Sequence, residues 1–315
     1  MDKILITLVG YKAYAFARLA IESILANTDE EFDLFIINNA PNDKFTSDYY
    51  KELQEIHPNV YVKTNPCNLG IAAPWNMALD AMFSNPEYKW ISLFHTDIVL
   101  NKNWASKIKE AFRTHPEYVG FAPVEINTTE TEYLTMPILT RSRHLYKYFC
   151  NHYLEDFEAL SSIFQKMYDG NFEAKATYYE DQLKDKIIEG AGFSAVTFKK
   201  EAFEKVGYFD EVFKCGTEDS DFTMRMSKLG LKTAKTGNSF AHHFCSVTFI
   251  KMIEIDGSQE AIKGKQTLLD KTTSTFEKTC LKHTCKHNNS GGCLLGYTCL
   301  NPLASCPLYL LEVTK

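Results

Sequence analysis

The sequence predicts an α/β fold in which a mostly parallel sheet is flanked by helices. Short β-rich runs alternate with amphipathic helical stretches over residues 1–125, which is the pattern of parallel strands joined by crossover helices. Each run ends in polar, glycine or proline residues. A chain of 315 residues is long enough for one large core with a small appendage. Ligands of open parallel sheets bind beyond the carboxyl ends of the strands, so we expect a binding site there.

The first part of the chain supplies four expected strands. Residues 3–9 form a buried-strand run, after which Phe16, Leu19, Ala20 and Ile24 recur at helical spacing. Further strands are expected over residues 32–37, 60–62 and 90–94, with helical segments between them. The segments that end the four strands are Gly10-Tyr11, Asn38-Asn39-Ala40-Pro41, Asn65-Pro66 and His95-Thr96-Asp97.

The pattern changes in the second part of the chain. Residues from about 125 to 189 are aromatic-rich and mostly helical, which predicts an insertion that packs its own aromatic side chains, forms an acceptor-binding surface, or does both. A strand is then expected over residues 193–198 and a helix over 218–229, closed by Gly230 in a left-handed cap. Two short strands, 231–235 and 239–244, complete a main domain of residues 1–250. Residues 251–315 are expected to form a helical extension and a cysteine-rich tail.

The composition is that of an ordinary folded protein, with 45% hydrophobic and 23% charged residues. A net charge of −6 without a long basic run argues against binding to nucleic acid mainly through phosphate contacts. The first residues lack the apolar run of a signal peptide, and no later run approaches the roughly 18 apolar residues of a membrane span. These features predict a cytoplasmic protein whose nine cysteines are thiols or metal ligands.

Five cysteines lie close together near the end of the chain. Together with His283 and His287 they offer the kind of ligands that bind structural Zn²⁺ in small segments without a core of their own. Free thiols packed on the main domain, and disulfides formed under oxidising conditions, are the alternatives. The cysteines are Cys280, Cys285, Cys293, Cys299 and Cys306.

An acidic segment opens the helix expected at residues 218–229. Glu218, Asp219 and Asp221 lie within four positions of one another, with Arg225 one turn further on. A carboxylate here could deprotonate a substrate hydroxyl, but the helix dipole also favours acidic residues in a first turn. The segment alone therefore leaves catalysis and helix capping open.

The order of several motifs resembles glycosyltransferase family 2, the inverting enzymes of the GT-A fold. Gly207-Tyr208-Phe209-Asp210-Glu211 precedes Glu218-Asp219-Ser220-Asp221 and Arg225, and Gly230 and the His242-His243 strand follow. Upstream, the first strand with Tyr11, the Asn38-Asn39-Ala40-Pro41-Asn42-Asp43 turn and Asn68-Leu69-Gly70 with Asn76 are similar to family landmarks. The resemblance covers residues 3–250 outside the insertion. It implies transfer of a hexose-type sugar from a UDP, GDP or dTDP sugar to a glycan, protein or small-molecule acceptor.

The resemblance also implies roles for individual residues. Asp219 matches the family's catalytic base, and Glu218 and Asp221 would support acceptor placement and the local structure. Asp97 matches the second acid of the family's aspartate-x-aspartate motif, which would bind Mn²⁺ or Mg²⁺ at the diphosphate. His95 replaces the first acid, and it could contact the ribose or phosphate region or be structural.

A late histidine often completes the metal site of this family. The spacing to Ser246 and Thr248 favours His243, with His242 as the alternative, and only one of two adjacent strand residues can face the ion. On the nucleotide side, Asn38 and Asn39 replace an acidic residue, Tyr11 would flank the base, and Asp43 or Asn68 could lie nearby. Any of these residues could instead serve only its turn.

Two competing functions stay open. The loss of the first acid at His95 is compatible with a non-catalytic module that binds a nucleotide sugar or a glycan. A transferase that modifies hydroxylated nucleic acid bases, with the cysteine-rich tail on the strand, is the second alternative.

Overall fold

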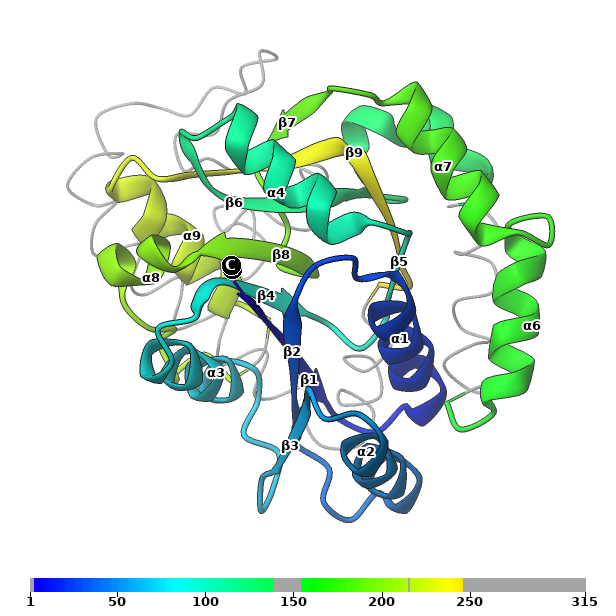
Figure 1. The fold of residues 1–315 in the computed structure, drawn as a ribbon, viewed down its shortest axis with the longest axis vertical. Helices are drawn as coiled ribbons and strands as arrows, with labels where there is room; N and C mark the ends of the chain where they lie inside the picture. Colours follow the sequence, from blue (N-terminus) through cyan, green and yellow to red (C-terminus); the bar gives the residue numbers. More distant parts are fainter. Residues whose placement is uncertain (1–2, 139–153, 215, 246–315) are drawn as a thin grey trace, which may run out of the picture.

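The computed structural model describes residues 3–138, 154–214 and 216–245, and the ribbon in Figure 1 shows how they are arranged. The cysteine-rich tail with Cys280, Cys285, Cys293 and Cys299 lies outside the described residues, as does the expected domain boundary near residue 250. No described helix is long and apolar enough to cross a membrane.

One nine-stranded sheet forms the centre of the described part of the molecule. The strand order is β3-β2-β1-β4-β8-β6-β9-β5, and β7 also pairs with β9. The pairs β3–β2, β2–β1 and β1–β4 are parallel, which confirms the parallel sheet predicted for the first part of the chain. The strands are β1 (Lys3–Gly10), β2 (Phe32–Asn38), β3 (Val60–Thr64), β4 (Tyr88–Phe94), β5 (Ile98–Leu100), β6 (Tyr118–Glu125), β7 (Ile187–Glu189), β8 (Ala195–Lys199) and β9 (Lys232–His243).

The second part of the sheet is mixed. Strand β8 runs antiparallel to both of its neighbours, β4 and β6, whereas β9 is parallel to β6 and antiparallel to β5 and β7. Strand β9 is continuous over the residues for which two short strands are predicted, and its register against β6 shifts between Pro123 and Val124. This irregularity lies opposite the break that the sequence pattern placed after residue 235.

Helices cover both faces of the sheet. Alternate β1 residues face opposite ways, so that Ile4, Ile6 and Leu8 pack under α1, α2 and α4, whereas Leu5 packs under α3, α8 and α9. The helices that lie wholly within the described residues are α1 (Tyr14–Asn27), α2 (Lys44–Ile56), α3 (Ala72–Ser84), α4 (Trp104–Thr114), the 3₁₀ turn η1 (Thr129–Thr131), α6 (Phe157–Met167), α7 (Phe172–Gln182), α8 (Lys200–Val206) and α9 (Glu218–Lys228).

The aromatic-rich insertion packs on the main domain through a third apolar cluster. Phe164 of α6 and Phe172 of α7 join Phe16 of α1 and Phe244, which follows β9. The Phe16 and Phe244 rings meet edge to face with their centroids 5.0 Å apart. Figure 1 shows α6 and α7 at the outer edge of the molecule, beside α1 and the end of β9. The insertion therefore shares its core with the sheet domain.

Candidate active site

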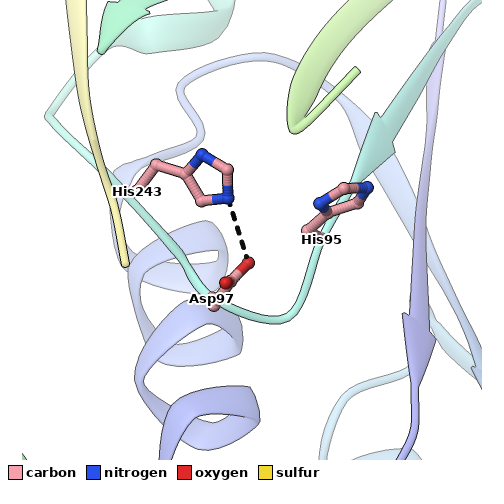
Figure 2. Close-up of side chains that lie close together, drawn as sticks. All are labelled: His95, Asp97 and His243. Atoms are coloured by element: carbon pink, nitrogen blue, oxygen red, sulfur yellow. Dashed lines mark ion pairs between the residues drawn. The ribbon is translucent and has the colours of Figure 1, made fainter. Parts of the chain in front are cut away.

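A histidine, an aspartate and a second histidine meet where β4, β5 and β9 come together. His95 and Asp97 lie in the turn between the end of β4 and the start of β5. Strand β5 pairs with β9 so that Ile98 lies opposite His243, and the Phe244 N–H donates to the Asp97 carbonyl at 3.0 Å. This antiparallel register brings His243, distant in sequence, beside Asp97 (Figure 2).

The three side chains form a compact set of possible metal ligands. One atom from each of His95, Asp97 and His243 lies within 4.8 Å of the others. His243 Nε2 is 3.4 Å from Asp97 Oδ1, and both side chains are largely shielded from solvent. The buried Nε2 atom of His95 has no hydrogen-bond partner among the described residues, and that of His243 has only the Asp97 ion pair. Buried polar atoms normally have hydrogen-bond partners, so this cluster suits a bound cation.

The spacing of the cluster also suits a cation. Two ligands at about 2.1 Å on adjacent corners of an octahedron lie about 3 Å apart. The 3.4 Å between His243 Nε2 and Asp97 Oδ1 is close to this value, and two imidazoles with one carboxylate are a donor set that transition-metal ions accept. These residues therefore fit the divalent cation that the sequence predicts.

A buried glutamate that the sequence analysis did not single out holds His243 in place. Glu125, the last residue of β6, accepts from His243 Nδ1 at 3.1 Å and also from the Ser194 hydroxyl. Burial by itself would raise the pKa of Glu125, but the His243 charge and the two hydrogen bonds lower it to about 2. Burial likewise opposes the charge on His243, and Asp97 and Glu125 overcome it and raise the pKa of His243 well above its ordinary value. A carboxylate behind a histidine ligand fixes its orientation.

His242 lies on the opposite face of β9, away from this cluster. It is fully buried, its Nδ1 lies 2.6 Å from the Tyr168 hydroxyl, and its ring packs edge to face against Phe244 and Phe164. Burial lowers the pKa of His242 to about 3, so the ring is neutral. The alternation of side chains along β9 thus separates the two histidines, with His243 in the cluster and His242 in the core shared with the insertion.

His95 is positioned by packing as well as by its backbone. Its backbone N–H donates to the Ser194 carbonyl at 2.9 Å, and its ring stacks on Trp75 of α3 with centroids 6.1 Å apart. Burial lowers the pKa of His95, and the nearby charges of Asp97 and Asp219 oppose this shift only in part. The charge of Asp219 therefore acts on the same ring that faces the cluster.

The acidic segment opens α9, as predicted, but its three carboxylates have different surroundings. Asp221 is buried and accepts from Arg225 Nε at 2.8 Å, and Arg225 also donates to the Val206 carbonyl. Glu218 is buried, accepts from the Thr217 N–H, and has a pKa raised to about 7 by burial and by the charge of Asp219. Asp219 is only partly buried.

One oxygen of Asp219 is available for a ligand. Its Oδ1 accepts from the N–H and the hydroxyl of Ser220 at 2.6 and 3.2 Å, and no hydrogen bond within the described part of the chain uses Oδ2. Of the three carboxylates, Asp219 is the one best placed to accept a proton from a ligand in the site.

The asparagines expected on the nucleotide side make hydrogen bonds within the protein. Asn39 Nδ2 donates to the Gly70 carbonyl at 2.7 Å, and Asn39 Oδ1 accepts from Asn65. Asn38 Nδ2 donates to the Ser47 hydroxyl, and Asn38 Oδ1 accepts from the Ala40 N–H. These bonds fix the turns after β2 and β3, which is the structural alternative left open by the sequence.

Asn76 connects helix α3 to the segment before α9. Its Nδ2 donates to the Phe209 carbonyl and to Glu211, and its Oδ1 accepts from the Phe209 N–H, each at 2.9 Å. These three bonds leave Asn76 no free donor, and they hold α3 beside the segment that leads into α9.

The turn at residues 68–70 supports the same region. Asn68 Oδ1 accepts from the Gly70 N–H, and the next residue, Ile71, donates to the Lys214 carbonyl at 2.7 Å. Gly70 has a φ of +83°, and a Cβ there would lie 2.1 Å from the Lys214 oxygen. Only glycine fits this close approach, which aligns the segment just before the acidic residues of α9.

Tyr11 and the residues after it form an unusual turn at the end of β1. Lys12 and Ala13 both have a φ of 54°, and the Lys12 ammonium lies 5.1 Å from the centre of the partly buried Tyr11 ring. Two consecutive left-handed non-glycine residues cost roughly 1–3 kcal/mol each, and such strain is found most often at binding sites.

Asp43 caps α2 by accepting from the Thr46 N–H at 3.2 Å.

The described structure thus combines an α/β sheet covered by helices on both faces with a cluster of possible metal ligands at the carboxyl end of β4. The model of glycosyl transferase family 2 matches residues 6–207, and the chain belongs to this family. The matched residues include His95 and Asp97, whereas Asp219 and His243 follow the matched segment.

Solved structures show the same fold at low sequence identity. GalNAc-T7, solved with UDP, GalNAc and Mn²⁺, is 9% identical with a TM-score of 0.50, and the alignment covers 76% of this chain and 43% of that one. The mannosyltransferase PcManGT from Pyrobaculum calidifontis, solved with GDP-Man and Mn²⁺, is 13% identical with a TM-score of 0.50, covering 87% and 64%. The chain thus spans less than two thirds of either neighbour. No curated protein matches the sequence.

Proposed function

We propose that this family 2 enzyme transfers a hexose-type sugar, with inversion, from a nucleotide diphosphate sugar to an acceptor hydroxyl. The observation that carries this proposal is that a possible cation site and a carboxylate lie close together at the carboxyl end of β4. The cluster of His95, Asp97 and His243 offers ligands for a cation, and Asp219 at the start of α9 is near enough for its charge to oppose the lowering of the pKa of His95. A cation site next to an accessible carboxylate is what diphosphate departure and proton removal require.

The proposed chemistry assigns one role to each residue. Asp97 and His243 hold a divalent cation, which neutralises charge on the leaving diphosphate when it is bound. Asp219 Oδ2 accepts the proton of the acceptor hydroxyl while the acceptor oxygen forms its bond to the anomeric carbon. The bond between that carbon and the diphosphate oxygen breaks, and its electron pair leaves with the diphosphate. Attack opposite the leaving group inverts the anomeric centre.

The supporting carboxylates maintain the geometry of this base. Glu218, with a pKa of about 7, is partly protonated near neutral pH, which limits repulsion beside Asp219. Asp221 fixes the first turn of α9 through its ion pair with Arg225. Both roles agree with the structural support that the family resemblance implies for these residues.

On the nucleotide side, we place the base beside Tyr11 and Asn68 rather than on Asn38, Asn39 or Asn76. The latter three side chains are buried and make hydrogen bonds that hold turns and helices together. The strained turn after Tyr11 and the partly exposed Asn68 follow the carboxyl ends of β1 and β3, where ligands of such sheets bind. The neighbours that contain UDP or GDP-Man support a nucleotide diphosphate sugar as the donor class.

Donor hydrolysis tests the proposal without knowledge of the acceptor. Wild type, Asp219→Asn and the surface control Asp48→Asn are incubated with UDP, GDP and dTDP sugars with and without Mn²⁺, and release of nucleoside diphosphate is measured. We expect metal-dependent release by wild type and the control, and a loss of roughly 10²–10⁴-fold in Asp219→Asn, the range for a general base.

The other outcomes point to the competing functions. If Asp219→Asn keeps wild-type release, Asp219 is not the base. If no donor is turned over, while a nucleoside diphosphate with Mn²⁺ still raises the melting temperature, the chain is a nucleotide-sugar binding module.

A further inference from the structure

We propose that His95 is a third protein ligand of the cation, and that the resulting site of two imidazoles and one carboxylate selects Mn²⁺ or Co²⁺ over Mg²⁺. This inference rests on the cation site of the proposed function and adds a residue and a selectivity to it. The family resemblance implies an acid at this position, so the chain has an imidazole where the family has a carboxylate.

The position of the ring is the first argument. A ring nitrogen of His95 belongs to the set of three ligand atoms that lie within 4.8 Å of one another. In Figure 2 the rings of His243 and His95 lie on either side, with the Asp97 carboxylate below and between them, so the three side chains are arranged around a common space. The rings of His95 and His243 lie 6.0 Å apart at an angle of 65°, so they are not stacked on each other.

The rigidity of His95 is the second argument. Its ring stacks on the fully buried Trp75 with an angle of 16° between the planes, and its N–H is bonded to the Ser194 carbonyl. Ser194 also donates its hydroxyl to Glu125, the residue that holds His243. Ser194 thus binds the backbone of His95 through its carbonyl and the support of His243 through its hydroxyl, which links the two sides of the cluster.

The chemistry of the donors then sets the selectivity. Mg²⁺ is a hard ion that is usually held by carboxylates and several waters, whereas imidazole suits transition-metal ions. For a fixed set of nitrogen and oxygen ligands, affinity rises from Mn²⁺ to Co²⁺. Exchange of a carboxylate for imidazole at position 95 therefore favours Co²⁺ and Mn²⁺ and disfavours Mg²⁺.

Metal binding, measured without any sugar transfer, tests the inference. Free Mn²⁺ is followed by its EPR signal, with and without UDP or GDP, while Mg²⁺ or Co²⁺ is added as a competitor. The proteins are wild type, His95→Asp, Asp97→Asn and the control His57→Asp, which makes the same chemical change at a histidine outside the cluster. Circular dichroism and thermal melting establish that each variant is folded, and His95→Asn serves as a second variant.

We expect Co²⁺ to displace Mn²⁺ from wild type more readily than Mg²⁺ does. In His95→Asp the preference for Mn²⁺ over Mg²⁺ should fall by about tenfold, whereas His57→Asp should match wild type. In His95→Asn, Co²⁺ should be weakened more than Mn²⁺. Unchanged metal ratios in the His95 variants, or a wild type that binds Mg²⁺ as tightly as Mn²⁺, would overturn the inference.

Failure of the proposed function gives different results. If Asp97→Asn binds Mn²⁺ like wild type, the cation does not bind at this cluster at all. If Asp97→Asn loses Mn²⁺ while the His95 variants keep wild-type ratios, the cation site stands and His95 is not one of its ligands. A wild type that binds neither Mn²⁺ nor Co²⁺ under any of these conditions overturns both.

Discussion

Replacement of Glu125 by glutamine tests how the buried carboxylate behind His243 stabilises the site. Glutamine keeps the size of the side chain and a hydrogen-bond acceptor, but it removes the negative charge that faces His243 Nδ1 at 3.1 Å. The new amide has one oxygen, so it can accept from Ser194 or from His243 but not from both, as the two oxygens of Glu125 do. The substitution therefore removes the charge of Glu125 and one of its two accepted hydrogen bonds, and it keeps the packing.

The magnitude follows from the shifted pKa of Glu125. The difference between the ordinary value of 4.5 and about 2 in the folded protein is about 2.5 units. At 1.36 kcal/mol per unit, this corresponds to about 3 kcal/mol of stabilisation. The raised pKa of His243 comes first from Asp97 and only in part from Glu125, so it is not added to this figure. Breaking a buried ion pair costs a similar amount, roughly 3–5 kcal/mol.

Urea unfolding of the metal-free protein measures the change in the free energy of unfolding. We expect Glu125→Gln to lose up to about 3 kcal/mol near pH 5.5, and its affinity for Mn²⁺ to fall roughly 10–100-fold, the usual effect of losing a partner behind a metal ligand. The control is Glu189→Gln, because Glu189 pairs with Lys232 on the surface, where such pairs contribute little. If the two variants have equal stabilities and Mn²⁺ affinities, Glu125 does not position His243.

The difference in stability between wild type and Glu125→Gln depends on pH in a defined direction. Glu125 has a lowered pKa, so its contribution is present above pH 4.5 and is lost as the pH falls toward 2. His243 has a raised pKa, so its contribution is present below pH 6.5 and is lost as the pH rises through its folded pKa. The gap in stability between wild type and Glu125→Gln should be largest between about pH 4.5 and 6.5. A gap that widens below pH 4.5 would contradict this assignment.

Three further substitutions separate structural support from the chemistry of the site. Tyr168→Phe removes the hydroxyl beside His242 and should cost about 1 kcal/mol in urea unfolding without changing Mn²⁺ affinity; a loss of Mn²⁺ binding would place His242 in the metal site. Gly70→Ala introduces a Cβ against the Lys214 carbonyl and should cost more than about 1 kcal/mol, while donor hydrolysis falls through displacement of the segment before α9; unchanged hydrolysis would contradict the bracing role. Asn76→Ala leaves buried backbone groups without partners and should cost roughly 1–3 kcal/mol, and a variant as stable as wild type would show that water replaces the amide.

The sequence predicts those parts of the fold that are specified by a local pattern of residues. Strand β1 spans residues 3–10 and helix α9 residues 218–228, each within one residue of the prediction, because buried strand runs and helix-opening residues are local features. Strand β5 was not predicted, since three residues carry too little periodicity. Strand β9 was divided in two because Gly237 and its polar neighbours resemble a turn, whereas pairing with β6 keeps the backbone extended.

The site shows the same division between local and long-range information. Asp97 and Asp219 could be found from short motifs, each of which lies within a few residues. Glu125 could not, because its role depends on pairing between β6 and β9, which brings it to His243 from far along the chain. The one local sequence signal is an acidic residue at the end of a mostly apolar run, which the structure shows to be a fully buried strand of eight residues. The roles of Asn38 and Asn39 likewise depend on partners in other turns.

The two adjacent histidines show how the pleat of one strand links the site to the insertion. Strand β9 directs His243 toward Asp97 and His242 toward Tyr168 of the insertion, so a shift of its register by one residue would exchange them. His242 is neutral and sits among aromatic rings, so such a shift would bury the charged His243 there without a carboxylate. The aromatic core shared with α6 and α7 therefore specifies the register that places His243 beside Asp97. The described part of the insertion therefore supports the site through the alignment of β9.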